Sequence, residues 1–228
     1  MNLRLIERHS ETNGVLTFTF EPEQPMVWQA GQYLHYTLRH DQEDDRGSER
    51  WFTIAAPPFE RRPRITTRLA AESSSFKQAL VRLPLGGVIE ADGPEGDFVV
   101  DDPEHDYVFI AGGIGITPFR AILLQLDHDR VSIHAHLLYA THQGDEPVFR
   151  RELDGLSARH PAFRVEYVTG PHRIGKADIR AAGANLHDPF YYVAGPEPMV
   201  KHYEEMLTGM GIAKDRIKVD DFPGYEAV

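Results

Sequence analysis

The hydrophobic pattern changes its period near the middle of this 228-residue chain, and that change limits the folds open to it. Up to about Phe98, apolar residues mostly alternate with polar ones, so that Leu16, Phe18 and Phe20 share one face. Strict alternation is typical of half-buried antiparallel strands. Several short strands, with one helix over 75–83, predict a small antiparallel barrel or sandwich. The expected strands cover residues 15–20, 32–38, 50–55, 64–69 and 88–91.

The second half repeats a different unit, in which a short apolar run is followed by a helical pattern. Strands that are buried on both faces and separated by helices are typical of a doubly wound parallel sheet. We therefore expect an antiparallel barrel domain over residues 1–101 and an α/β domain over residues 102–228. The predicted strands are 107–111, 133–140, 163–168, 190–193 and 217–219, and the predicted helices are 118–126, 148–158, 177–182 and 197–210.

Composition excludes several classes of protein. The net charge is −11, from 35 acidic and 24 basic residues, and no basic stripe is visible, so we expect no nucleic-acid partner. Cysteine is absent, which excludes disulfides, thiolate catalysis and cysteine-held metals. Redox chemistry would need an organic cofactor. No run reaches the roughly 18 apolar residues of a membrane span, and the first residues are too charged for a secretory signal, so we expect a cytoplasmic protein without membrane insertion.

A glycine turn at residues 112–118 lies between the first apolar strand of the second half and a helix. Its three glycines let the backbone approach a pyrophosphate, and the start of a helix favours negative charge. We expect Thr117 to cap this helix and Pro118 to occupy its first position. Because the pattern ends in proline where the usual dinucleotide fingerprint has glycine, a purely structural turn stays open as an alternative.

A second glycine-bearing tip, residues 194–199, follows the predicted strand 190–193 and again opens a helix. The carboxyl ends of parallel strands lie at one edge of a sheet, where doubly wound folds bind their ligands. The two tips are therefore expected to lie side by side, and together they could hold one extended dinucleotide.

The barrel half carries its own candidate anion site. Alternation places Arg50 and Phe52 on one face of a strand and Trp51 and Thr53 on the other. Arginine binds phosphate through two hydrogen bonds, and an aromatic ring offers a surface for stacking. The serines at 73–75 open the predicted helix of this half, which is a second place for an anion. An ion pair for Arg50, a core position for Phe52 and a simple serine cap are the structural alternatives.

Four segments together, 50–53, 93–98, 112–118 and 194–196, resemble the ferredoxin–NADP reductase superfamily in order and spacing, and the resemblance covers nearly the whole chain. It implies an FAD-binding barrel followed by an NAD(P)-binding domain. It also implies hydride transfer from NADH or NADPH to bound FAD, and then electron transfer to a separate acceptor protein or small molecule. Two rival functions stay open: a reductase that uses free flavin as its substrate, and a flavin-binding sensor or subunit without turnover.

The resemblance also implies site residues by position. Thr53 would orient the flavin near its N5 atom, Thr117 would approach the nicotinamide ribose, and Phe222 or Tyr225 would shield the flavin ring until nicotinamide displaces it. The implied FAD contacts are Arg50, Phe52, Thr53, Thr67, Arg68, Ser74, Ser75 and Phe76. The implied NAD(P) contacts are Gly112, Gly113, Gly115, Thr117, Pro118, Thr141, His142, Gly195, Pro196 and Met199.

Three departures from the family pattern bear on function. Phe52-Thr53 replaces the usual Tyr-Ser, which removes a phenolic hydrogen bond to the flavin, and Ala194 replaces a common cysteine. His142 stands where many NADP-preferring members have arginine, and a carboxylate that would favour NAD is missing there, so coenzyme preference stays open.

Two further groups of residues are candidates for binding a ligand. The adjacent Arg150 and Arg151 are most simply solvated, although they could meet a 2′-phosphate. His134 and His136 share a predicted strand face, but no third ligand stands at a recognisable spacing. We therefore expect no metal site.

Overall fold

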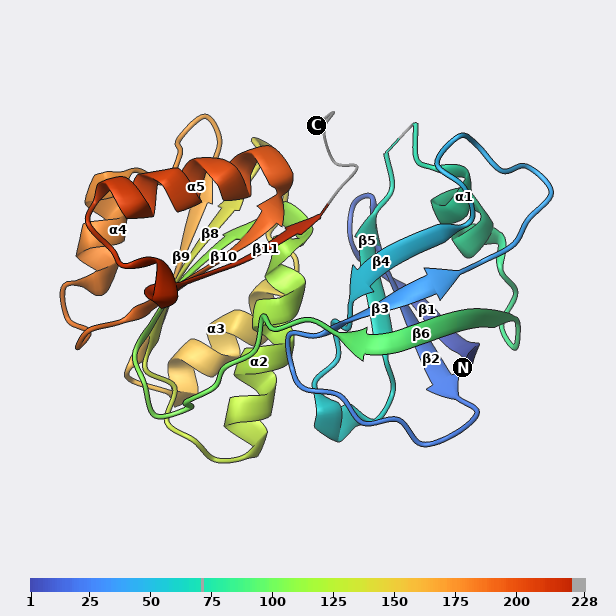
Figure 1. Ribbon diagram of the computed structural model, residues 1–228, viewed down its shortest axis with the longest axis horizontal. Coiled ribbons are helices and arrows are strands. Elements are labelled where there is room, and N and C mark those ends of the chain that lie inside the picture. The colour runs from blue at the N-terminus through green and yellow to red at the C-terminus, as the bar shows by residue number, and fades with distance from the viewer. Residues whose placement is uncertain (71, 223–228) are drawn as a thin grey trace.

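The computed structural model describes residues 1–70 and 72–222, and Figure 1 shows two lobes side by side. The first lobe is a six-stranded antiparallel sheet in the order β4-β3-β6-β1-β2-β5. Just beyond β4, the Ala55 N–H donates to the Arg64 carbonyl at 3.0 Å, so the sheet nearly closes into a barrel. Its elements are β1 (Asn2–Thr12), β2 (Val15–Pro22), β3 (Tyr33–Thr37), β4 (Glu49–Thr53), β5 (Arg64–Arg68), α1 (Ser75–Arg82) and β6 (Val88–Glu95).

Inward-pointing side chains of alternate strand residues fill the barrel, and α1 contributes Phe76 to the same core. Phe52 is 9% exposed, and its ring lies between those of Tyr36 and Phe76, at centroid distances of 5.9 and 5.8 Å. Arg50 lies 5.7 Å from the Phe76 ring centroid, as expected for a residue on the same face as Phe52. Phe52 is therefore a core residue, which is the alternative to a flavin contact that the sequence analysis left open.

The second lobe is a five-stranded sheet in the order β11-β10-β7-β8-β9, with every pair of neighbours parallel. Helices α2 and α3 pack on one face and α4 and α5 on the other (Figure 1), so the predicted barrel and doubly wound sheet are both confirmed. The elements are β7 (Tyr107–Gly112), α2 (Ile116–His128), β8 (Ala135–Thr141), α3 (Arg150–Arg159), β9 (Phe163–Thr169), α4 (Lys176–Gly183), β10 (Phe190–Pro196), α5 (Glu197–Gly209) and β11 (Ile217–Phe222).

Two elements differ from the sequence prediction. The sequence pattern did not predict β1, because apolar and polar residues alternate clearly only around Leu3 and Leu5. These two residues point into the core, and the later residues of β1 are mostly exposed or half-buried. Helix α2 begins at Ile116 rather than at Pro118. A short 3₁₀ turn, Gly113–Gly115, runs directly into it, which brings the helix start two residues closer to β7.

A buried arginine joins the two lobes. Arg120 on α2 is 3% exposed, and its Nη1 donates to the Ala55 carbonyl of the barrel at 2.7 Å. Its Nε and Nη2 donate to the Glu152 carboxylate on α3 at 2.6 and 2.8 Å. At a second point of contact, Arg68 on β5 pairs with Asp145 at 2.8 Å. These bonds hold the lobes against each other, while the predicted domain boundary between residues 101 and 102 stays a prediction.

The histidines that invited a metal interpretation have other partners. His134 precedes β8 rather than lying within it and is 3.4 Å from Asp106, whereas His136 is 3.8 Å from Glu166. Within residues 1–70 and 72–222, no group of three metal-ligating side chains comes together. Over the same residues no helix has the length and apolar character needed to cross a membrane. The cytoplasmic location stays a prediction.

Candidate functional site

The two glycine-bearing tips lie side by side at one edge of the parallel sheet. Strands β7 and β10 pair in parallel, with Ala111 opposite Ala194, and this register sets Gly195 beside Gly112. A cavity of about 680 Å³ opens at this edge. The first tip contributes Gly112, Gly113 and Gly115 to its wall, and the second contributes Pro196 and Met199. The predicted juxtaposition of the tips is thus present.

The three glycines of the first tip are needed for different reasons. A Cβ at Gly115 would lie 2.1 Å from the Ala194 carbonyl oxygen, which belongs to the backbone of β10 and cannot move aside. At Gly112 the nearest atom would be the Met199 sulfur at 2.0 Å, on a flexible side chain. Gly113 has φ +54° and no neighbouring atom within 4 Å of such a Cβ. Gly115 is therefore required by packing, and Gly113 by its left-handed backbone.

The prediction that Thr117 caps α2 was wrong. The cap position is Gly115, and Thr117 is instead the second residue of the helix, where its Oγ1 donates to the Ile114 carbonyl at 3.0 Å. Pro118 is the third residue rather than the first, and it is tolerated there because the first-turn N–H groups have no partner within the helix. Both residues are buried, and neither lines the cavity.

The rest of the cavity wall is rich in basic side chains. Thr141 ends β8 and His142 follows it, while His172 and Arg173, which the sequence prediction missed, follow β9. Including Arg68 from the barrel and His202 from α5, the described wall residues hold two arginines and three histidines but no aspartate or glutamate. In a chain with net charge −11, such a wall suits a ligand that carries phosphate groups.

Arg50 sits in the barrel with part of its guanidinium unsatisfied. Its Nη1 donates to the carbonyls of Arg46 and Gly47 at 2.6 and 3.4 Å. Its Nη2 is buried and has no hydrogen-bond partner among the described residues; the nearest opposite charge is Asp44 Oδ1 at 4.0 Å. Burial lowers the pKa of Arg50. A buried donor of this kind fits an incoming anion.

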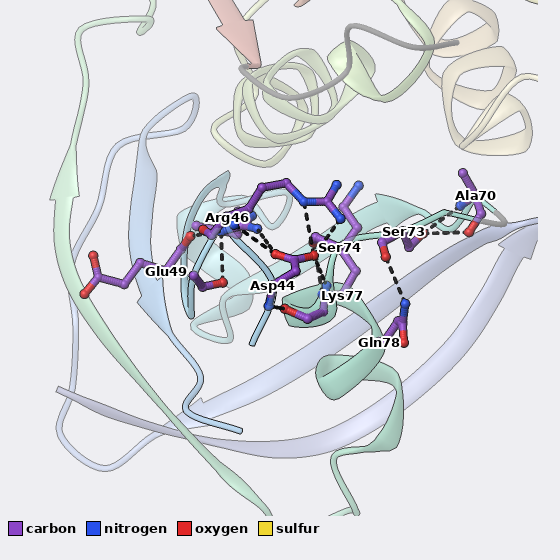
Figure 2. Close-up of polar contacts among 11 residues, drawn as sticks. Asp44, Arg46, Glu49, Ala70, Ser73, Ser74, Lys77 and Gln78 are labelled. Carbon is purple, nitrogen blue, oxygen red and sulfur yellow. Dashed lines mark hydrogen bonds and ion pairs between the residues drawn. The ribbon is translucent and has the colours of Figure 1, made fainter. Parts of the chain in front are cut away.

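Helix α1 begins beside Arg50, and Ser74 is its N-cap as predicted, accepting from the Lys77 N–H at 3.4 Å. Figure 2 shows Asp44 directed at this helix start. Asp44 Oδ2 accepts from the Ser75 N–H at 2.8 Å and from Arg46 Nη2 at 2.6 Å. The Arg46 and Ser75 donors hold the pKa of Asp44 well below its usual range. The predicted anion site therefore already binds a carboxylate.

A second carboxylate marks the junction of the lobes. Thr53, 4% exposed at the end of β4, donates from Oγ1 to Asp220 Oδ2 on β11 at 3.4 Å. Burial raises the pKa of Asp220 to about 7, and the Thr53 hydrogen bond only partly offsets this. Phe222, two residues further, lines the cavity, whereas Tyr225 lies outside the described residues. The sequence prediction missed Asp220, because its partner is 167 residues away.

Known oxidoreductases share the fold and parts of the sequence of this chain. Residues 109–205 match the family model of the oxidoreductase NAD-binding domain. The structure is similar to a ferredoxin NADP⁺ reductase from Neisseria gonorrhoeae solved with bound FAD and NADP, with a TM-score of 0.78 and 18% identity. That likeness covers 97% of this chain and 98% of the other. The predicted resemblance to the ferredoxin–NADP reductase superfamily is confirmed.

The sequence relatives are longer than this chain. It is 27% identical to a flavohemoprotein from Pseudomonas putida, over 96% of this chain and 58% of that protein. It is 24% identical to the glycine betaine monooxygenase reductase subunit of Chromohalobacter salexigens, over 97% of this chain and 64% of that protein. The chain thus spans about three fifths of the length of these curated relatives.

The structure brings most of the predicted site residues into three groups, while Phe52 lies in the barrel core and Thr117 and Pro118 are buried in α2. Their roles as ligand contacts stay predictions. At the junction lies Thr53 with Asp220, and Thr67, fully buried on β5, stands before Arg68. At the start of α1 lie Arg50, Ser74, Ser75 and Phe76. Around the cavity lie Arg68, Gly112, Gly113, Gly115, Thr141, His142, Pro196, Met199 and Phe222, with Gly195 directly behind.

Proposed function

We propose that this chain is an NAD(P)H-dependent flavoprotein reductase, with FAD in the barrel lobe and the nicotinamide coenzyme in the cavity of the α/β lobe. The observation that carries the proposal is the reach of this cavity across the lobes. Its wall combines the glycine turn after β7 with Arg68 of the barrel strand β5. A dinucleotide held by the glycine turn would therefore extend to the lobe that carries the second anion site.

The barrel residues fit the diphosphate of FAD. The buried Nη2 of Arg50 has no hydrogen-bond partner in the described part of the chain, and the Ser75 N–H already binds an oxyanion, the Asp44 carboxylate. We assign Arg50, Ser75 and Phe76 to the diphosphate and Thr53 to the edge of the flavin ring. Bound FAD supplies a two-electron acceptor that passes electrons on singly or in pairs. Because Phe52 is only 9% exposed, little of its ring is free to contact FAD.

At the junction, Thr53 and Asp220 control a proton. With a pKa of about 7, Asp220 is largely neutral below neutrality, and its half-buried carboxyl group then holds a proton. The Thr53 hydroxyl donates to Oδ2 and so fixes the orientation of this carboxyl group. We propose that the pair holds a proton beside the flavin ring, whereas the sequence resemblance implied only an orienting role for Thr53.

We further infer that NADPH is the preferred coenzyme. The ribose 2′-hydroxyl of NAD is usually bound by a carboxylate at a strand tip, and none of the described cavity-wall residues is acidic. Arg173 and His172 instead offer donors to a 2′-phosphate. The earlier candidate Arg150 pairs with Asp154 at 3.6 Å, lies over the Tyr167 ring, and is absent from the wall.

The electron acceptor is proposed to be a separate protein or a small molecule. One relative is named as the reductase subunit of a monooxygenase, a system in which reductase and oxygenase are different chains. The chain has no cysteine, so it cannot hold an iron–sulfur cluster through thiolates. We therefore propose that electrons leave the flavin directly to a partner protein or to a small molecule.

The proposal is tested by isolating the protein, identifying any bound flavin, and following flavin absorbance after mixing with NADPH or NADH. Bleaching of bound FAD, faster with NADPH, is the expected result. Turnover of added free flavin with none retained would favour the flavin reductase. Bound flavin that neither coenzyme bleaches would favour the sensor or subunit. If no flavin binds under any condition, the proposed function is wrong.

A further inference from the structure

The loop between β3 and β4 folds onto the start of α1, where the Asp44 carboxylate occupies the position of an anion. Two hydrogen bonds fix the contact: the Ser75 N–H donates to Asp44 Oδ2 at 2.8 Å, and the Asp44 N–H donates to the Ser75 hydroxyl at 3.0 Å. Arg46 Nε and Nη2 hold the same carboxylate oxygen at 3.1 and 2.6 Å. Asp44 thus reproduces the contacts that a phosphate oxygen makes at a helix start.

The same loop conformation also engages Arg50. Its Nη1 donates to the carbonyls of Arg46 and Gly47 in this loop and of Glu49 at the start of β4. Its Nη2 points toward Asp44 without a hydrogen bond, at 4.0 Å. The two positive features expected to hold a diphosphate, the guanidinium and the helix start, are therefore both turned toward residues of one loop.

We propose that Asp44 competes with the FAD diphosphate for the start of α1 and thereby sets the affinity of this protein for flavin. The inference rests on the proposed function. One Ser75 N–H cannot serve two oxyanions, and a phosphate beside the Asp44 carboxylate would place like charges together. FAD therefore binds tightly only after residues 41–47 have left the helix start.

The energetics make this competition reversible. The contact consists of polar bonds at a half-buried position, and Asp41, Gln42, Glu43 and Asp45 on the same loop are exposed. When a phosphate replaces the carboxylate, charge-assisted hydrogen bonds are exchanged for others of the same kind. The loop thus makes FAD exchangeable, which places this chain between a reductase with permanently bound FAD and one that uses free flavin.

Asp44→Asn tests the proposal, because it keeps the side-chain shape and removes the charge. Titration of the flavin-free protein is expected to show FAD binding about tenfold tighter than in the unsubstituted protein. Riboflavin, which has no phosphate, is expected to bind both proteins equally. Asp45→Asn is the matched control, since it removes the same charge from an exposed neighbour. It is expected to change FAD affinity less than about twofold.

A second measurement separates competition from simple loop damage. Without flavin, Asp44→Asn is expected to unfold at a lower temperature, because the helix start loses a charged acceptor. With saturating FAD, the unfolding temperature of Asp44→Asn is expected to rise by more than that of the unsubstituted protein. Equal FAD affinity in both proteins, or an equal gain for riboflavin, would overturn the competition and leave the proposed function standing. If neither protein binds FAD, the proposed function fails and this inference with it.

Discussion

The two lobes use the same physical device, the start of a helix, in opposite ways. At α1 in the barrel, the Asp44 carboxylate accepts a hydrogen bond from the Ser75 N–H, and Arg46 and Arg50 lie beside it. At α2 in the α/β lobe, the glycine turn faces a cavity whose described wall contains no acidic side chain. The nature of the neighbouring loop thus decides whether a helix start is closed by the chain or left open to a ligand. We expect the coenzyme site to be preformed and the flavin site to require rearrangement.

The largest effect is expected from Gly115→Ala, which tests whether the open site is rigid. The added methyl group would lie 2.1 Å from the Ala194 carbonyl oxygen, so strand β10 or the turn must shift. We expect a loss of about 3 kcal/mol in the free energy of unfolding, measured with urea, and loss of coenzyme binding. Gly113→Ala is the control, since its methyl group meets no atom and only its positive φ is unfavourable, at about 1 kcal/mol. Equal losses would show that contact with β10 is not what requires glycine.

A smaller effect is expected from Arg173→Gln, which tests whether the cavity beside α2 prefers NADPH over NADH. Loss of a charge-assisted contact to the 2′-phosphate should raise KM for NADPH about tenfold or more and leave KM for NADH unchanged. Steady-state kinetics with both coenzymes measure this. Arg150→Gln removes the same charge from a residue outside the cavity wall and should leave both values as they are. Equal loss with both coenzymes would contradict the assignment of Arg173.

A pH-dependent effect is expected from Asp220→Asn, which compares the carboxylate at the junction of the lobes with the one at the start of α1. The pKa of Asp220 is raised from 3.8 to about 7, so between these values the folded chain binds its proton more readily than the unfolded chain. Stability from this group therefore falls as the pH rises from about 4 to 7. Between pH 5 and 8 the unsubstituted protein should lose roughly 2 kcal/mol more than Asp220→Asn. Asp215→Asn, at an exposed position, should follow the unsubstituted protein; a variant at 220 that does the same would refute the raised pKa.

Local patterns in the sequence predicted the architecture, because strand alternation and the strand–helix rhythm are properties of neighbouring residues. They also located both glycine-bearing tips, since parallel strands must end at one edge. The cap assigned to Thr117 was wrong because a 3₁₀ turn joins α2 and moves its start to Ile116. Strand β1 was missed because alternation is clear only around Leu3 and Leu5.

The polar contacts that define the site could not be predicted, because each joins distant parts of the chain. Asp44 and Ser75 are 31 residues apart, and Thr53 and Asp220 are 167 apart. No spacing rule connects such pairs; only the folded barrel and the docked lobes bring them together. Arg173 was missed for a simpler reason, since one arginine after a strand carries no pattern of its own.

The buried Arg120 has a consequence for the angle between the lobes. It lies on α2, the helix that starts at the coenzyme cavity, and it bonds to the Ala55 carbonyl two residues after Thr53. Opening the lobes would break this charge-assisted hydrogen bond, which costs about 1.5–3 kcal/mol, whereas the Glu152 pair lies within the α/β lobe and stays intact. Hinge bending is therefore unfavourable, and we expect the angle between the lobes to be the same in the free and ligand-bound forms. Substrate access then depends on individual side chains at the mouth of the cavity, such as Met199 and Phe222.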